Sequence, residues 1–125
     1  MKFNSTRNPD LNVGLREAVF QGLAPDGGLY MAREEPDLKD VFMAMDQESS
    51  FTDVAAAIMT RLFPEEFSPA DCRRICTEAF PFSPVLRRLD KDLHLLELFH
   101  GPSCAFKDFG ASFLATVMQE YLRKD

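Results

Sequence analysis

A lysine near the C-terminal end of the sequence stands where its amine could act as a nucleophile. Lys107 opens a stretch whose apolar residues recur at helical spacing, namely Phe109, Phe113, Leu114, Val117, Met118 and Leu122. In the first turn of a helix, the positive end of the dipole disfavours the ammonium form, and apolar neighbours such as Ala105, Phe106 and Phe109 disfavour it further. The resulting amine could attack a carbonyl and later move a proton, so Lys107 is a candidate Schiff-base lysine. The residues themselves leave open the alternative of a solvated surface lysine.

The other residues with reactive side chains favour structural roles. Asp108 is the ordinary acidic residue of a first helical turn, and His100 precedes it in a loop. Three cysteines and two distant histidines do not form a zinc pattern, so we expect no metal site. Cys72 and Cys76, four residues apart on a helical stretch, are expected to pack in the core rather than to react.

The elements next to the lysine predict a hairpin, a loop and a final helix. Apolar runs at 85–89 and 93–99 flank the turn residues 90–92, which is typical of two antiparallel strands. A loop from His100 to Phe106 follows. The helix is expected to begin at Lys107 and to continue almost to the end of the chain.

Two helices before the hairpin have clear start signals. Ser50 precedes an alanine-rich apolar stripe, and Ser68 is followed by a proline at the first helical position, so we expect helices over 51–63 and 69–80. Residues 37–80 therefore form a small helical cluster without a polar constellation. Its expected role is structural.

The first thirty residues predict short elements around a tight turn. We expect a strand within 2–7, a helix of about two turns between Gly14 and Gly22, and a strand at 29–31. The intervening Pro25-Asp26-Gly27-Gly28 favours a turn. A phosphate cradle formed by Gly27 and Gly28 is the weaker alternative, because no helix start follows them.

Length and composition bound the protein class. With 125 residues, 46% of them hydrophobic, one small domain is the default. The net charge of −6 and the absence of a basic run argue against nucleic acid as a partner. No apolar stretch could span a bilayer and no signal peptide is apparent, so we expect no membrane partner and a cytoplasmic location.

Three segments together resemble the threonine synthase family of pyridoxal-phosphate (PLP) enzymes. The longest match runs from Leu96 to Ala111, LELFHGPSCAFKDFGA, which is similar to that family's lysine motif. Ser5-Thr6-Arg7 and QGLAPDGGLY at 21–30 are similar to its N-terminal signatures. The family more often has Thr where this sequence has Ser103, a change that keeps the hydroxyl. It usually has an aliphatic residue in place of Cys104, for which a small buried side chain is favoured over a redox-sensitive thiol.

The resemblance implies a fold, a cofactor and a reaction. The fold is α/β, the N-terminal part of a tryptophan-synthase-β-like (fold type II) PLP enzyme, here with short strands, a small helical cluster and a terminal helix carrying the lysine. Lys107 would form the Schiff base with PLP in an enzyme that converts O-phosphohomoserine and water to threonine and phosphate, the last step of threonine biosynthesis and a carbon–oxygen lyase reaction. The residues His100, Ser103, Phe106 and Asp108 are candidates for shaping the site.

The resemblance also implies that this sequence is one part of a larger enzyme. We expect an N-terminal domain over 1–80, then a linker, strand pair and lysine helix over 81–125 that begin the PLP-binding domain. The family's phosphate-binding loop follows the lysine helix, so the chain alone is expected to be inactive, and its uncovered apolar surface is expected to cause self-association. Two alternatives remain: a related PLP-dependent phospho-lyase, and a non-catalytic interaction module.

Overall fold

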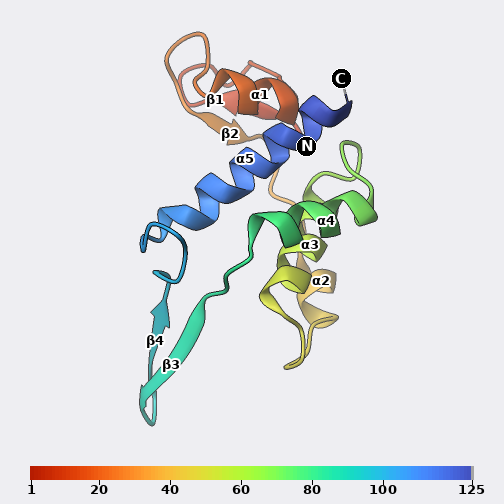
Figure 1. Cartoon of the computed structure of the whole chain (residues 1–125). Coiled ribbons are helices and arrows are strands. Elements are labelled where there is room, and N and C mark those ends of the chain that lie inside the picture. Colours follow the sequence, from red (N-terminus) through yellow and green to blue (C-terminus); the bar gives the residue numbers. More distant parts are fainter. Residues whose placement is uncertain (125) are drawn as a thin grey trace.

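The computed structural model describes residues 1–124 as a small mixed α/β structure (Figure 1). Its strands are β1 (Phe3–Ser5), β2 (Tyr30–Ala32), β3 (Val85–Asp90) and β4 (Leu93–Glu97). Its helices are α1 (Leu15–Gln21), α2 (Lys39–Met43), α3 (Phe51–Leu62), α4 (Pro69–Ala79) and α5 (Lys107–Lys124). The strands form two separate antiparallel pairs, β1 with β2 and β3 with β4. No helix within the described part of the chain is long and apolar enough to cross a membrane.

The N-terminal strands and helix follow the sequence prediction. Strand β1 pairs with β2 so that Ser5 lies opposite Tyr30, and α1 occupies the chain between them. Helix α1 ends at Gly22, whose φ of 73° is a backbone conformation that glycine adopts at little cost. The predicted helix between Gly14 and Gly22 is confirmed.

Helices α3 and α4 start where the capping signals predict. Ser50 accepts a hydrogen bond from the backbone N–H of Asp53, and Ser68 accepts one from that of Asp71. In both cases the aspartate carboxylate accepts from the serine backbone N–H in return, which completes a capping box. Both helices end one residue before the predicted ends.

The core lies where α3, α4 and the C-terminal half of α5 meet. Its buried residues are Leu15, Ala56, Met59, Phe63, Phe67, Cys72, Ile75, Cys76, Val117 and Tyr121. Burial raises the pKa of the Cys76 thiol to about 11 and also raises that of Cys72. The prediction that these two cysteines pack in the core is confirmed, because an enclosed thiol with a raised pKa is a poor nucleophile.

Helix α5 is fixed to the rest of the chain along its C-terminal half. Val117 and Tyr121 enter the core, and the Phe113 ring stacks on Phe80 at a centroid distance of 6.0 Å. The Tyr121 hydroxyl donates to a carboxylate oxygen of Glu66 at 2.9 Å. The expected division at residue 80 stays a prediction; in the structure the last helix shares one core with the residues before it.

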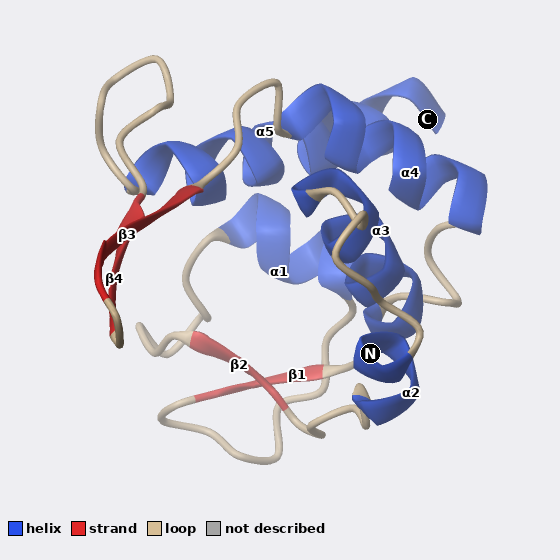
Figure 2. Cartoon of the chain, turned by 90° about the horizontal axis from the view of Figure 1, so that it is seen from below, coloured by secondary structure: helices blue, strands red, loops and turns tan. Residues whose placement is uncertain are grey.

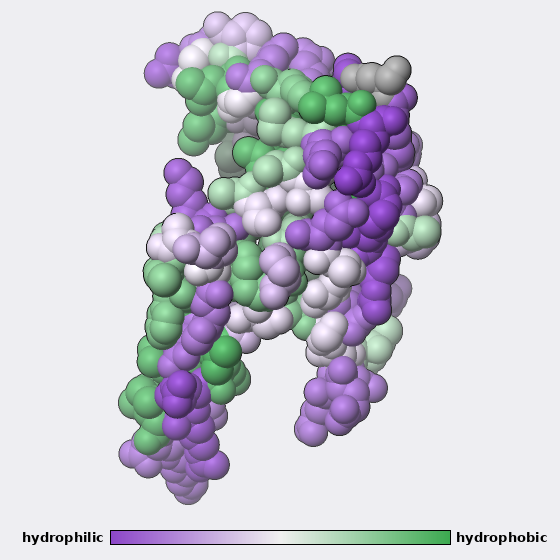
Figure 3. All heavy atoms as spheres, viewed as in Figure 1, coloured by the Kyte–Doolittle hydropathy of each residue, from purple (hydrophilic) through white to green (hydrophobic). Residues whose placement is uncertain are grey.

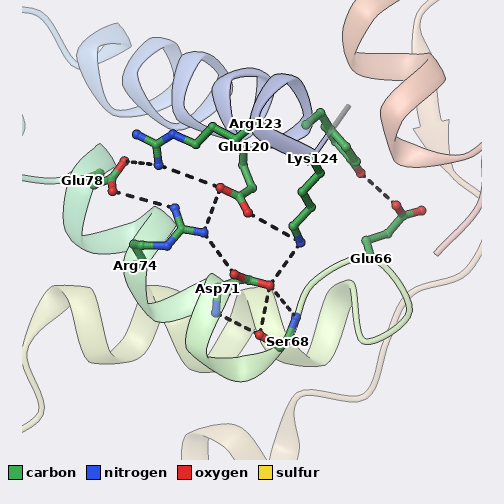
Figure 4. A network of polar contacts seen from close by, with 9 residues as sticks. Glu66, Ser68, Asp71, Arg74, Glu78, Glu120, Arg123 and Lys124 are labelled. Atoms are coloured by element: carbon green, nitrogen blue, oxygen red, sulfur yellow. Dashed lines mark hydrogen bonds and ion pairs between the residues drawn. The ribbon is translucent and has the colours of Figure 1, made fainter.

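A network of charged side chains joins α4 to the end of α5 (Figure 4). Arg74 lies 2.8 Å from the buried carboxylate of Glu120 and 3.0 Å from that of Asp71. Lys124 Nζ lies 3.1 Å from the same Asp71 carboxylate, on the side away from Arg74. The Lys124 ammonium, the Ser68 cap and Arg74 together lower the pKa of Asp71 to about 2.

This network predicts a loss of stability in acid. The folded-state pKa of Asp71 lies below its ordinary value of 3.8, so the carboxylate stabilises the fold above about pH 4. That contribution should disappear as the pH falls from about 4 to about 2. The capping carboxylate of Asp53, whose pKa is also lowered to about 2, titrates in the same window. Urea unfolding across pH 2–6 at fixed ionic strength should therefore show a shallower acid loss for Asp71→Asn than for the parent chain. Parallel curves for the two proteins would contradict the assignment to Asp71.

The hairpin β3–β4 extends away from the helical core at the Lys107 end of α5 (Figures 1 and 2). Leu86 lies opposite Leu96 and Arg87 opposite Leu95, with a register shift between Arg88 and Asp90. The tight turn is Lys91-Asp92, shorter than the predicted turn over 90–92, because Asp90 still pairs with Leu93. Strand β4 ends at Glu97, two residues before the predicted 99.

The hairpin is exposed and carries apolar side chains along its sides, with hydrophilic ones over its front and tip in the view of Figure 3. Its exposed apolar residues are Val85, Leu86, Leu89, Leu93, Leu95 and Leu96. Glu97 is the exception among the hairpin residues, with only 6% of its surface exposed. A carboxylate is thus the most buried side chain of these two strands.

Candidate functional site

Lys107 is the first residue of α5 and is exposed to solvent. Within residues 1–124 its amine takes part in no ion pair or side-chain hydrogen bond. The enclosure expected from apolar neighbours is wrong for these residues: Phe106 is 74% exposed, and Ala105 is exposed too. Phe109 turns away into the helical cluster, where its ring meets that of Phe51 at 5.6 Å. What the described residues provide is an accessible amine at a helix start.

Asp108 ties the helix start to the preceding loop. The Ser103 backbone N–H donates to Asp108 Oδ2 at 2.8 Å, and the Ser103 hydroxyl donates to Oδ1. The Ser103 hydroxyl, followed by the backbone donors of Ser103 and Ala105, holds the pKa of Asp108 below its usual range despite burial. Asp108 therefore binds the preceding loop in addition to lying in the first turn of α5, as the sequence predicts. The Ser103 hydroxyl is one of the two donors to its carboxylate.

Gly101 allows Asp108 to approach the loop backbone closely. A Cβ atom at Gly101 would lie 2.5 Å from Asp108 Oδ2 and 2.7 Å from Asp108 Cβ, closer than real Cβ contacts. The loop then turns back on itself, with the Cys104 N–H donating to the Gly101 carbonyl at 3.1 Å. Only glycine fits at position 101 without displacing the carboxylate.

The structure corrects the interpretation of Cys104. Its side chain is exposed, so the expected buried position is wrong for these residues. The backbone there has φ 56°, the left-handed region that non-glycine residues rarely adopt. Cys104 closes the tight turn that begins at Gly101, and its side chain is exposed in this conformation.

His100 is joined to a carboxylate that the sequence analysis did not single out. Its Nε2 lies 2.9 Å from Glu97 Oε2, and the other carboxylate oxygen accepts from Arg87 Nε at 2.6 Å. The Phe99 and His100 rings also contact each other, with centroids 4.8 Å apart. One signal could have revealed Glu97: it falls on the same strand face as Leu93 and Leu95, where alternation predicts an apolar residue.

The two N-terminal signature segments are hydrogen-bonded to each other. Asp26 Oδ1 accepts from the Ser5 hydroxyl at 2.7 Å and from the Gly28 N–H at 2.8 Å, and Arg7 donates to the Asp26 carbonyl. The Gly28 N–H bond, then the Ser5 hydroxyl, lower the pKa of Asp26. Because the Gly27 N–H is also taken, by the Ala24 carbonyl, this segment is the predicted turn and not a phosphate cradle.

The candidate site is therefore an exposed amine held by a braced loop. Hydrogen bonds from Ser103 to Asp108 and between Glu97 and His100 fix the loop at both ends. Such an amine can bind an aldehyde or ketone carbon covalently and can then carry a proton. The described residues of the loop offer no second group placed to act on a substrate.

Comparison with protein families places most of the chain in one of them. Residues 2–80 match the family model described as threonine synthase N terminus. Threonine synthase of Schizosaccharomyces pombe is 32% identical over 99% of this chain and 25% of its own length. The chain spans about a quarter of the length of the curated relatives it matches.

Solved structures agree with the sequence comparison. The PLP-bound threonine synthase from Brucella melitensis matches with a TM-score of 0.84 and 35% identity, over 99% of this chain and 28% of that one. Threonine synthase from yeast matches with a TM-score of 0.85 and 32% identity, over 98% of this chain and 26% of that one. These matches extend beyond residue 80 and include the hairpin, the loop and α5.

Proposed function

The chain belongs to the threonine synthase family, and from this premise we propose that Lys107 is the lysine that holds PLP in such an enzyme. The membership confirms the resemblance seen in the sequence, and the matched structures confirm the fold class as the N-terminal part of a fold type II PLP enzyme. The single observation that carries the proposal is the exposed, unpaired Lys107 amine at the end of a braced loop within residues 1–124.

The residues present suit the amine-binding end of the cofactor. An aldehyde needs an amine that is accessible and not engaged in an ion pair, and Lys107 meets both requirements. Phe106 is the exposed ring next to it. The Gly27-Gly28 turn does not supply a phosphate cradle, since its backbone N–H donors are taken. The rest of the cofactor site would come from the remaining three quarters of the enzyme.

The reaction we propose for the whole enzyme converts O-phosphohomoserine and water to threonine and phosphate, a carbon–oxygen lyase reaction that ends threonine biosynthesis. PLP, when bound, supplies an electron sink for this elimination and replacement. Lys107 Nζ would hold the cofactor, and as an amine it would accept and return protons during the reaction. Asp108, Ser103 and His100 hold the loop, and the exposed Phe106 stays a candidate for shaping the site. The chain alone is expected to be inactive.

Trapping with borohydride tests the assignment of Lys107. The purified chain is mixed with PLP, reduced, digested and mapped by mass spectrometry, with the exposed hairpin-turn residue Lys91 as an internal reference. We expect more label at Lys107 than at Lys91, because Lys107 lies at the positive end of α5 whereas Lys91 lies in the hairpin turn, away from any helix start. In Lys107→Ala the absorbance change on adding PLP should fall while labelling of Lys91 stays constant.

Equal labelling of Lys107 and Lys91 would count against a site prepared within these residues. A matched control is Lys39→Ala, which removes a lysine from the first turn of the short helix α2 and should leave labelling at Lys107 unchanged. Loss of labelling at Lys107 in Lys39→Ala would show that labelling by PLP depends on the net charge of the chain rather than on a particular amine.

One alternative function and two further expectations remain beside this proposal. A related PLP-dependent phospho-lyase would use the same lysine, so it differs from the first proposal only in the fate of the substrate. Self-association of the isolated chain is supported by the exposed leucines of the hairpin and by Phe99 and Phe106 beside them. A cytoplasmic location stays a prediction.

A further inference from the structure

Glu97 is a buried carboxylate that joins three parts of the chain. It lies at the end of β4 with 7% of its side chain exposed, Arg87 reaches it from β3, and His100 reaches it from the lysine loop. Arg87 is a diagonal neighbour of Glu97, since Val85 is the residue directly opposite it. Each carboxylate oxygen has its own donor, Oε1 with Arg87 and Oε2 with His100.

The charge state of Glu97 settles the direction of the bond to His100. The Arg87 guanidinium, and after it His100, hold the pKa of Glu97 below its usual range, so the side chain is ionised at neutral pH. An ionised carboxylate only accepts hydrogen bonds. His100 must then donate from Nε2, which fixes the orientation of the imidazole ring relative to β4.

The residues that follow His100 contact the start of α5 directly. The next residue, Gly101, lies against the Asp108 side chain so closely that a Cβ atom would overlap with it. Asp108 in turn receives both donors of Ser103 and is the residue after Lys107. The Glu97 carboxylate is therefore linked to the backbone at Lys107 by a continuous series of direct contacts.

We propose that Glu97 is a positioning residue, which acts through His100 to fix the loop that presents the Lys107 amine. Arg87 keeps the carboxylate ionised and holds its Oε1, and its side-chain hydrogen bond is to Glu97. The functional meaning of this arrangement rests on the proposed role of Lys107, but the bracing of the loop by Glu97 is a property of these residues alone and is measurable without the cofactor.

Glu97→Gln tests the bracing with little change in side-chain size. A glutamine keeps an acceptor oxygen for Arg87 but places an uncharged amide next to His100, so the hydrogen bond from His100 Nε2 to a carboxylate is lost, and an amide bond can replace it only if the imidazole changes tautomer. We expect amide hydrogen exchange at Ser103 and Cys104 to speed up about tenfold, the effect of losing a charge-assisted hydrogen bond. The amide of Ile75 in α4 should keep its protection, which verifies that the variant is folded.

Asp92→Asn is the matched control for the loss of charge. It makes the same change in net charge in the same hairpin, but at the exposed turn between β3 and β4. Exchange at Ser103 and Cys104 should stay within about twofold of the parent in this control. The same result in Glu97→Gln would overturn the proposal.

A double-mutant cycle separates action through His100 from simple support of the hairpin. His100→Asn should speed up exchange at Ser103 and Cys104 as much as Glu97→Gln does, and the two changes combined should add nothing further. The imidazole Nε2–H proton of His100 should be visible by NMR in the parent and exchange-broadened in Glu97→Gln, while the exposed His94 is alike in both. If the two effects add instead, Glu97 stabilises the hairpin without using His100, and the proposal is wrong.

Borohydride trapping with PLP distinguishes a failure of this inference from a failure of the proposed role of Lys107. In Glu97→Gln the excess of label at Lys107 over Lys91 should fall, as expected for a lysine on a loosened loop. If the parent shows no excess while the exchange results hold, the cofactor role of Lys107 fails within this chain and the bracing by Glu97 stands. If the parent shows the excess but exchange is unchanged in Glu97→Gln, the bracing fails and the role of Lys107 stands.

Discussion

Replacing Gly101 by alanine should open the lysine loop while leaving the helical core folded. The added Cβ would lie 2.5 Å from one carboxylate oxygen of Asp108, which is held there by its two bonds from Ser103. Overpacking of this kind costs about 1–3 kcal/mol, a factor of roughly 5 to 150 in the local opening equilibrium. Hydrogen exchange at Ser103 and Cys104 should rise by that factor, and the excess of PLP label at Lys107 should disappear.

A second glycine in the same region provides the control for Gly101→Ala. Gly110 lies one turn into α5, and a Cβ atom there would meet nothing within 4 Å. Gly110→Ala should therefore stabilise the helix by about 0.5–1 kcal/mol, because alanine has less backbone entropy to lose than glycine. Unchanged protection of Ser103 in Gly101→Ala would mean that Asp108 can move aside freely, which its bonds to Ser103 argue against.

Replacing Ile75 by alanine should have the largest effect on global stability. Ile75 is fully buried in α4 among the residues of the core, where α3 and α5 also meet. Truncation of such a side chain costs about 2–5 kcal/mol, the sum of lost apolar transfer and of the cavity left behind. Against the 5–15 kcal/mol typical of a small domain, this is a large share of the free energy of unfolding. Urea unfolding followed by circular dichroism should show a lower midpoint at an unchanged slope.

Leu86→Ala is the matched truncation on the surface. Leu86 is 66% exposed on β3, so its removal should change the free energy of unfolding by no more than about 0.5 kcal/mol. Equal effects of the two substitutions would mean that the hairpin, and not the junction of α3, α4 and α5, contains the stabilising core.

Local signals in the sequence determined most of the element boundaries. Ser50 before an apolar stripe and Ser68 before a proline predict the starts of α3 and α4, because a helix cap uses side chains within one turn of the helix. The turn at 25–28 and the end of α1 at Gly22 were predicted from residues that tolerate unusual φ values. Where the signal was weaker, as in the hairpin turn, the boundary was off by a residue or two.

The surroundings of the lysine could not be predicted in the same way. The position of Lys107 at a helix start was correct, but the apolar enclosure assigned to Ala105, Phe106 and Phe109 was not found. Neighbours of Lys107 in the sequence are not its neighbours in space, because the helix turns Phe109 toward Phe51 and Phe106 lies in solvent. Cys104 was misjudged for the same reason, since a turn with positive φ directs its side chain outward.

What the sequence determined by itself is the family, the helix starts and the lysine, because each is encoded in a run of neighbouring residues. What the tertiary structure decided is how that lysine is held: Glu97 meets Arg87 and His100, and Gly101 meets Asp108, through contacts between separate elements. Burial, hydrogen-bond direction and the pKa of a carboxylate depend on which atoms approach in space, and strand register and loop closure set that approach. Spacing along the chain does not contain this information.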